Sequence, residues 1–145
     1  VGDIVRAGLV VDSRTGERFG DAASPQVLVS APAIASVREK ERLYASYRAS
    51  AVDMEAAAVA RAAQMRGLSF QAIKAISDDA TFELKELARF GTKDGQFREA
   101  AFAAHAAVRP NLWRKLFQLA GNSNRAIAAL TEELKSQLDW YRQRD

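Results

Sequence analysis

Two segments of the chain decide its fold class: Ala51-Val-Asp-Met-Glu-Ala-Ala-Ala-Val-Ala60 and Phe70-Gln-Ala-Ile-Lys-Ala-Ile-Ser-Asp-Asp79. The first starts as the end of a strand, and Asp53 is placed to cap a helix over residues 54–66, with Gly67 as its C-terminal stop. The second opens with an apolar run over residues 70–76, which predicts a buried central strand. A strand, a helix and a strand joined by a right-handed crossover predict two parallel strands whose carboxyl ends share one sheet edge.

The residues before this unit predict further strands and one more helix. Residues 2–19 favour a strand with a hairpin-like return at the turn signal Ser13 to Gly16. Residues 26–30 are apolar and are bounded by prolines, which favours a short buried strand. Ser36 and Glu39 form a Ser-x-x-Glu capping box, so we expect a helix from there to about residue 48.

The remainder of the chain is expected to be mostly helical. We expect a helix over residues 98–109, a second one that ends near Gly121, and a third one from Asn124 onward. Spacings of three and four give the last helix an apolar stripe of Ile127, Leu130, Leu134, Leu138 and Tyr141. Packing of this stripe on the protein body is favoured over a dimerising coiled coil. The chain thus reads as one domain, with an α/β part over residues 1–80 and a helical part over 81–145.

Composition excludes several classes of function. The 145 residues hold 21 Lys and Arg against 18 Asp and Glu, a net charge of +3, which argues against a dedicated nucleic-acid binder. There is no cysteine and only one histidine, His105, so disulfides, thiolate nucleophiles and multi-histidine metal centres are excluded, and no metal site is expected. No apolar run is long enough for a membrane span, and we expect a cytoplasmic location.

Charged residues alternate in sign along the helix expected after residue 36. Arg38, Lys40 and Arg42 interleave with Glu39 and Glu41. An anion-binding patch is one interpretation, but alternating charges on one helix more often form a solvated face, which we favour.

Two acidic groups are expected at the same sheet edge. Asp53 and Glu55 stand at a strand end and helix start, and Asp78 and Asp79 follow the next strand. The edge formed by strand carboxyl ends is where α/β proteins bind ligands, so these groups could face each other across a pocket. The alternative is structural: Asp53 caps a helix, Glu55 adds a favourable first-turn charge, and Asp79 caps a turn or points into solvent.

The two quoted segments closely resemble the paired signatures of the purine and uridine phosphorylase family, especially its methylthioadenosine and adenosylhomocysteine nucleosidase branch. Gly2-Asp3-Ile4-Val5 and Thr15-Gly16-Glu17-Arg18 are also similar to that family. The resemblance covers about residues 2–80. It implies a three-layer α/β/α fold with a mixed central sheet, and cleavage of the N-glycosidic bond of a purine nucleoside in nucleoside catabolism or salvage.

The resemblance also implies roles for individual residues. Met54 would line the ribose site, and Glu55 would accept hydrogen bonds from the ribose hydroxyls. Asp78 would protonate or hydrogen-bond the purine N7, with Ser77 supporting it; burial beside other carboxylates would favour the protonated form. Ile34 occupies the place in the base pocket where many members of the family carry an aromatic residue.

No cofactor is implied, although phosphate is a possible co-substrate. The family places its phosphate-binding loop in an N-terminal half that precedes these signatures, and this chain begins at Val1, so we expect it to be the C-terminal portion of such a fold. Phosphorolysis and hydrolysis therefore both stay open. A small-molecule nucleoside is the expected partner, in a homo-oligomer, because members of the family commonly form dimers or hexamers.

Three further interpretations stay open. Residues 82–130 resemble the tail of hopanoid-associated phosphorylases, which would point to an adenosylated lipid as substrate. A non-catalytic nucleoside- or lipid-binding protein would keep the ribose contacts without the reaction. A helical interaction module over residues 98–142 would use the rest of the chain as a scaffold.

Overall fold

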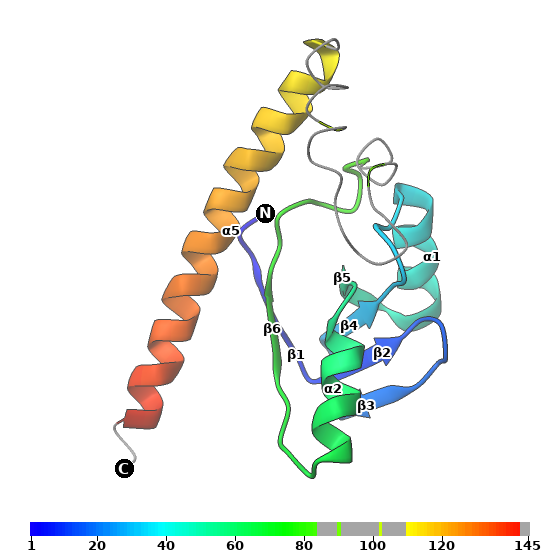
Figure 1. Cartoon of the computed structure of the whole chain (residues 1–145), viewed down its shortest axis with the longest axis vertical. Helices are drawn as coiled ribbons and strands as arrows, with labels where there is room; N and C mark the ends of the chain where they lie inside the picture. The colour runs from blue at the N-terminus through cyan, green and yellow to red at the C-terminus, as the bar shows by residue number, and fades with distance from the viewer. Residues whose placement is uncertain (84–89, 91–101, 103–109, 143–145) are drawn as a thin grey trace.

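The structure is a computed structural model that describes residues 1–83, 90, 102 and 110–142. Figure 1 shows an α/β body with one long helix, α5, running along one side of it. This arrangement confirms the expected α/β class with a mixed sheet and a helical C-terminus.

The body is built on a four-stranded mixed sheet with the strand order β3-β2-β4-β5. β2, β4 and β5 run parallel, and β3 pairs antiparallel with β2, which confirms the expected hairpin. The strands span Leu9–Asp12 (β2), Arg18–Gly20 (β3), Val27–Ser30 (β4) and Ala49–Asp53 (β5). All four residues of β4 are buried, as the apolar run between two prolines predicts.

Helices cover both faces of this sheet. Because successive strand residues point to opposite faces, Val10 and Leu28 pack with Ala57 of α2 (Ala56–Met65), whereas Val29 packs with Leu43 of α1 (Val37–Tyr47). The two clusters give the layers α1, sheet and α2. Leu28 and Leu43 are fully buried, so they anchor the two sides of the core.

A second, two-stranded sheet corrects one expectation. β6 (Ala72–Ala75) pairs antiparallel with β1 (Ile4–Ala7) and does not join β5 as a parallel neighbour. The chain passes from β1 into β2 at Gly8, where a Cβ atom would lie 2.4 Å from the Ser24 hydroxyl. The apolar run predicts that residues 70–76 form a strand. It does not predict which strand pairs with β6, because that partner, β1, comes from a distant part of the sequence.

Local signals place the ends of both body helices. The Ser36 hydroxyl accepts a hydrogen bond from the Glu39 N–H at 3.2 Å, which confirms the expected start of α1. α2 begins at Ala56, two residues later than expected, with Glu55 as its N-cap residue, and the Asp53 carboxylate accepts the Ala56 N–H at 3.0 Å. The helix stops before Gly67, whose φ of 64° is the expected left-handed conformation.

The C-terminal helix differs from expectation in its length. α5 is one continuous helix, Pro110–Arg142, and it passes through Gly121, where we expected a break. An interior glycine costs about 1 kcal/mol relative to alanine, which a long helix with tertiary packing tolerates.

The rotation of α5 about its axis also differs from expectation. Asn122 and Ala126 are buried, and the helix contacts β6 and β1. Three members of the predicted stripe point outward instead: Ile127 is 63% exposed, Leu134 45% and Leu138 59%. Small and polar side chains therefore form the packed face, and the prediction that the stripe packs on the body was wrong for these three residues.

A charged contact on the packed side of α5 accompanies this rotation. The guanidinium of Arg6 on β1 makes a two-pronged contact with Glu133, with Nε donating to Oε1 at 2.7 Å and Nη2 donating to Oε2. Glu133 is 11% exposed in its side chain, so it faces the body, and the adjacent stripe residue Leu134 turns toward solvent.

Apart from Phe102, the expected helix over residues 98–109, with His105, lies outside the described residues, and so does the side chain of Tyr141. Among the helices that the structure describes, none combines the length and the apolar character needed to cross a membrane.

Candidate active site

A cavity of about 190 Å³ lies where α1, the end of β5 and the turn after β6 meet. The segment before α1 contributes small and apolar residues, α1 itself contributes a lysine, and the β5–α2 connection and the β6 turn contribute acidic residues. The lining consists of Ala33, Ile34, Ala35, Lys40, Val52, Asp53, Met54, Glu55 and Asp78. Both predicted acidic segments thus reach one cavity, although their strands are not hydrogen-bonded neighbours.

Asp53 is the most enclosed of these acids, with a side chain only 7% exposed. Its carboxylate accepts the Ser30 hydroxyl at 2.6 Å and the Ala56 N–H at 3.0 Å, and Lys74 Nζ lies 2.7 Å away. These contacts join β4, β5, β6 and the start of α2. Asp53 therefore holds the cavity wall together, which matches the structural alternative for this residue.

Met54 and Glu55 follow directly and stand in the connection ahead of α2. Met54 is 50% exposed, and the Glu55 side chain is 64% exposed with Lys74 Nζ at 3.8 Å. The Met54 N–H donates to Glu55 Oε2 at 3.4 Å, which turns the carboxylate back along the connection. Glu55 keeps acceptor capacity at the surface of the cavity, where a ligand hydroxyl can reach it.

Asp78 lies on the other acidic segment and is more enclosed than Glu55, with a side chain 20% exposed. Its Oδ2 is 2.5 Å from Lys40 Nζ, and its Oδ1 accepts the Ser77 hydroxyl at 3.1 Å. Ser77 is not part of the lining and reaches the site through Asp78, whereas Ile34 contributes directly to the wall. The charge facing Asp78 is a lysine ammonium, not the carboxylate we expected to favour its protonation.

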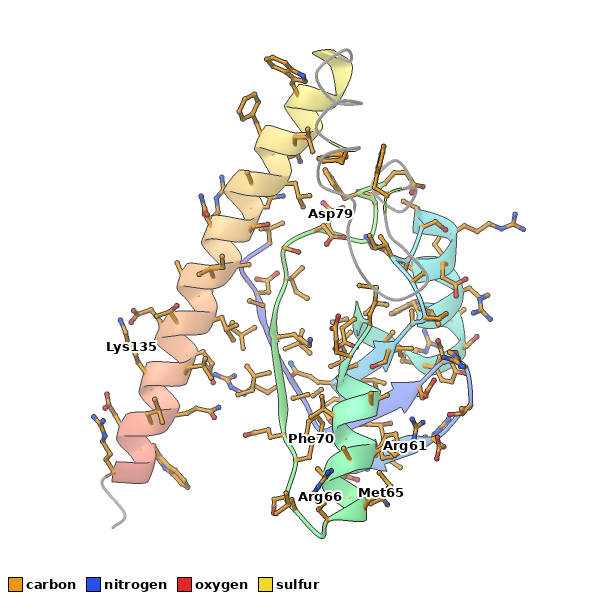
Figure 2. The ribbon with its side chains drawn as sticks, in the orientation of Figure 1. Arg61, Met65, Arg66, Phe70, Asp79 and Lys135 are labelled. Atoms are coloured by element: carbon orange, nitrogen blue, oxygen red, sulfur yellow. The ribbon has the colours of Figure 1, made fainter. Side chains whose placement is uncertain are left out.

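Asp79 serves the turn and not the cavity. Its carboxylate accepts the Thr81 hydroxyl at 2.7 Å and the Thr81 N–H at 2.9 Å. The Thr81 hydroxyl, more than any other group, lowers the pKa of Asp79 below its usual value. Figure 2 shows Asp79 in the connection beyond the end of β6.

Sequence reasoning missed Lys40. The charged face of α1 is solvated at Arg42, which pairs with Glu39 at 2.6 Å, but the Lys40 side chain is only 14% exposed. A signal was available in the helical spacing, since Lys40 stands three residues before the fully buried Leu43 and so shares its side of the helix.

Lys74 was missed as well. It lies within the apolar run that forms β6 and contacts both Asp53 and Glu55. A lysine inside a strand that the sequence predicts to be buried calls for a nearby carboxylate, because an unpaired charge is costly away from water. That rule, applied to the sequence, would have predicted an acidic partner for Lys74.

The site lies within a recognised family region. A model of the phosphorylase superfamily matches residues 23–110, more than half of the chain and all of the cavity lining. The chain belongs to the phosphorylase superfamily. Comparison with curated proteins and with solved structures gave no significant match. Membership indicates activity of the nucleoside phosphorylase or nucleosidase type.

Proposed function

We propose that the cavity binds a purine nucleoside and that the protein cleaves its N-glycosidic bond, by phosphorolysis or hydrolysis, in nucleoside catabolism or salvage. The observation that carries this proposal is the meeting of Glu55 and Asp78, from two separate segments, on one cavity inside the family region. A sugar-binding carboxylate and a base-binding acid are two of the groups that this reaction needs.

At the sugar end, Glu55 accepts hydrogen bonds from the ribose hydroxyls and Met54 packs against the ring. A carboxylate binds hydroxyl donors through charge-assisted hydrogen bonds. Its negative charge also stabilises the positive charge that develops on the sugar as the base departs. The exposure of both side chains supports this role, because the sugar can reach them from solvent.

At the base end, Asp78 in its protonated, carboxylic acid form hydrogen-bonds or protonates the purine N7, which makes the base a better leaving group. Ser77 orients the carboxylate by donating to Oδ1, and Ile34 packs beside the base. The partial burial of Asp78 supports the role, since a polar contact is stronger where water is scarce.

The reaction is tested by release of free base from adenosine, methylthioadenosine and adenosylhomocysteine, with and without phosphate. Release only with phosphate identifies phosphorolysis with phosphate as co-substrate, and release without it identifies hydrolysis. No release in either condition would reject catalysis by this chain and favour a nucleoside-binding protein.

Asp78→Asn tests the role of the base-end acid. We expect kcat to fall about a hundredfold or more while nucleoside binding is retained, because the amide cannot supply a proton. Asp139→Asn is the matched control, since Asp139 is an exposed residue of α5 outside the cavity. Unchanged turnover in Asp78→Asn would remove this residue from the proposed mechanism.

An adenosylated lipid is the second candidate substrate. Met54 and Glu55 place the proposed sugar end at the protein surface, where a bulky group on the ribose could extend outward. A synthetic adenosine with a long apolar 5′ substituent tests this proposal. A kcat/KM above that of methylthioadenosine supports it, and a lower value argues against it.

We further propose a homo-oligomer. On α5, exposed residues recur at alternating spacings of three and four, the pattern of a helix-pairing seam. They are Phe117, Ala120, Asn124, Ile127, Thr131, Leu134 and Leu138, referred to below as the α5 seam.

A further inference from the structure

We propose that Lys40 is a positioning residue of the active site, which fixes Asp78 and the turn that carries it against α1. The effect on catalysis rests on the proposed function of Asp78. The anchoring of the turn stands on the geometry alone and can be tested without substrate.

The contacts of Lys40 support this role directly. Its Nζ contacts Asp78 Oδ2 at 2.5 Å, the Asp79 carbonyl at 2.9 Å and the Phe82 carbonyl at 3.2 Å. An ammonium group has three N–H donors, and these three acceptors use all of them. Lys40 therefore acts on the substrate through Asp78 and does not offer a donor of its own.

The turn depends on this lysine for its attachment to α1. Up to Ile76, backbone hydrogen bonds to the N-terminal segment hold the end of β6. The Ile76 carbonyl accepts the Gly2 N–H at 2.8 Å, and the Ile76 N–H donates to the Asp3 carbonyl at 3.0 Å. Beyond it, the bonds from Thr81 and Phe82 to Asp79 close the turn on itself. In the described part of the chain, Lys40 joins this closed turn to the helix.

Burial makes the pair more than a surface ion pair. Lys40 and Asp78 are 14% and 20% exposed in their side chains, whereas Arg42 on the same helix is 62% exposed. Removing one partner of an enclosed pair leaves the other charge without compensation, so the turn would shift toward solvent. A displacement of about 1 Å at a reacting group can lower a rate on the order of a hundredfold.

The test compares Lys40→Met, which keeps the length of the side chain without its charge, with Lys40→Arg, which keeps the charge. Lys135→Met is the control, because Lys135 is an exposed lysine of α5 that pairs with Glu132, an exposed residue of the same helix. On the nucleoside that the wild type cleaves, we expect Lys40→Met to lower kcat about a hundredfold, with KM changing less than kcat. Lys40→Arg should restore part of kcat, and the control should match the wild type.

A double substitution shows whether Lys40 acts through Asp78. If it does, Lys40→Met combined with Asp78→Asn has the kcat of Asp78→Asn alone, because the residue being positioned is already inactive. If kcat of the double variant instead falls by the product of the two separate losses, the two residues act independently and the proposal is overturned.

Amide hydrogen exchange tests the anchoring independently of turnover. The N–H groups of Thr81 and Phe82 lie in the closed turn, and we expect both to exchange faster in Lys40→Met than in the wild type or in Lys40→Arg. Equal exchange in all three proteins would overturn the anchoring role. Absence of base release by the wild type would reject the proposed function instead, and the exchange result would still decide the role of Lys40.

Discussion

At the scale of single residues, Ser30 links the core of the sheet to the cavity. It is 6% exposed, and its hydroxyl donates to Asp53 Oδ1 at 2.6 Å and accepts the Ala57 N–H at 2.9 Å. Ser30→Ala leaves both partners without this hydroxyl, so we expect the free energy of unfolding to fall by about 1–3 kcal/mol in urea denaturation. Ser136→Ala, at an exposed position of α5, is the control, and an equal effect in both variants would contradict the prediction.

Arg61 on α2 makes stability depend on pH. It contacts Asp12 at 2.9 Å and also pairs with Glu17, and its hydrogen bonds lower the pKa of both carboxyl groups below their usual values. A depressed carboxyl pKa stabilises the fold above the pH where the unfolded group titrates, about 4, and this stabilisation is lost as the pH falls through the folded value.

Arg61→Met therefore should lower the unfolding midpoint in urea at pH 7. Between pH 7 and pH 3, the midpoint of this variant should fall by less than the midpoint of the wild type. The effect should be modest, because these groups are partly exposed to solvent. Arg66→Met, on the same helix, is the control, since Arg66 donates to the Ala62 carbonyl and has no carboxylate partner among the described residues. If the midpoints of the wild type and of Arg61→Met fall by the same amount between pH 7 and pH 3, Arg61 is not the source of this pH dependence.

At the scale of secondary-structure elements, Gly121 and Gly67 are opposite cases of one residue type. Gly121 lies inside continuous α5, and a Cβ atom there meets no other atom within 4 Å. Gly121→Ala should therefore raise the free energy of unfolding of the chain by about 1 kcal/mol. Gly67→Ala should lower it by a similar amount, because its φ of 64° is strained for alanine. Destabilisation by Gly121→Ala in thermal or urea unfolding would indicate that the helix breaks there.

The elements that the sequence predicts well are those set by neighbouring residues. The cap at Ser36, the buried β4 and the stop at Gly67 each depend on a few adjacent side chains, and the structure confirms all three. The partner of β6 and the rotation of α5 depend on contacts between distant segments, such as the contact of Arg6 with Glu133. Periodicity cannot supply these contacts, since it describes one segment at a time.

At the scale of the whole molecule, the candidate site also combines residues that local motifs predict with residues that only contacts between distant segments define. Short motifs indicated the acids Glu55 and Asp78, and both line one cavity although their strands, β5 and β6, belong to different sheets. Their cationic neighbours, Lys40 and Lys74, come from a helix face and a strand whose orientation only the assembled fold defines. Charge pairing across the cavity is therefore the part of the site that sequence patterns left out.

The α5 seam makes a prediction about assembly. All seven of its residues are exposed, and Asn124 stands within it as a polar residue that can fix the register of paired helices. We expect light scattering after size exclusion to give a mass that is a multiple of the 15.9 kDa chain. Leu134→Lys combined with Leu138→Lys should reduce that mass by placing like charges across the seam, without changing the circular dichroism.

The control for this prediction carries two lysines at exposed positions of α5 outside the seam, Gln118→Lys and Ser136→Lys. It has the same net charge change as the seam variant, so a loss of assembly in both would reflect charge alone. A wild-type mass of one chain would contradict the oligomer. Assembly that survives the seam substitutions would place the interface elsewhere on the molecule, because two buried lysines without partners are incompatible with an apolar helix contact.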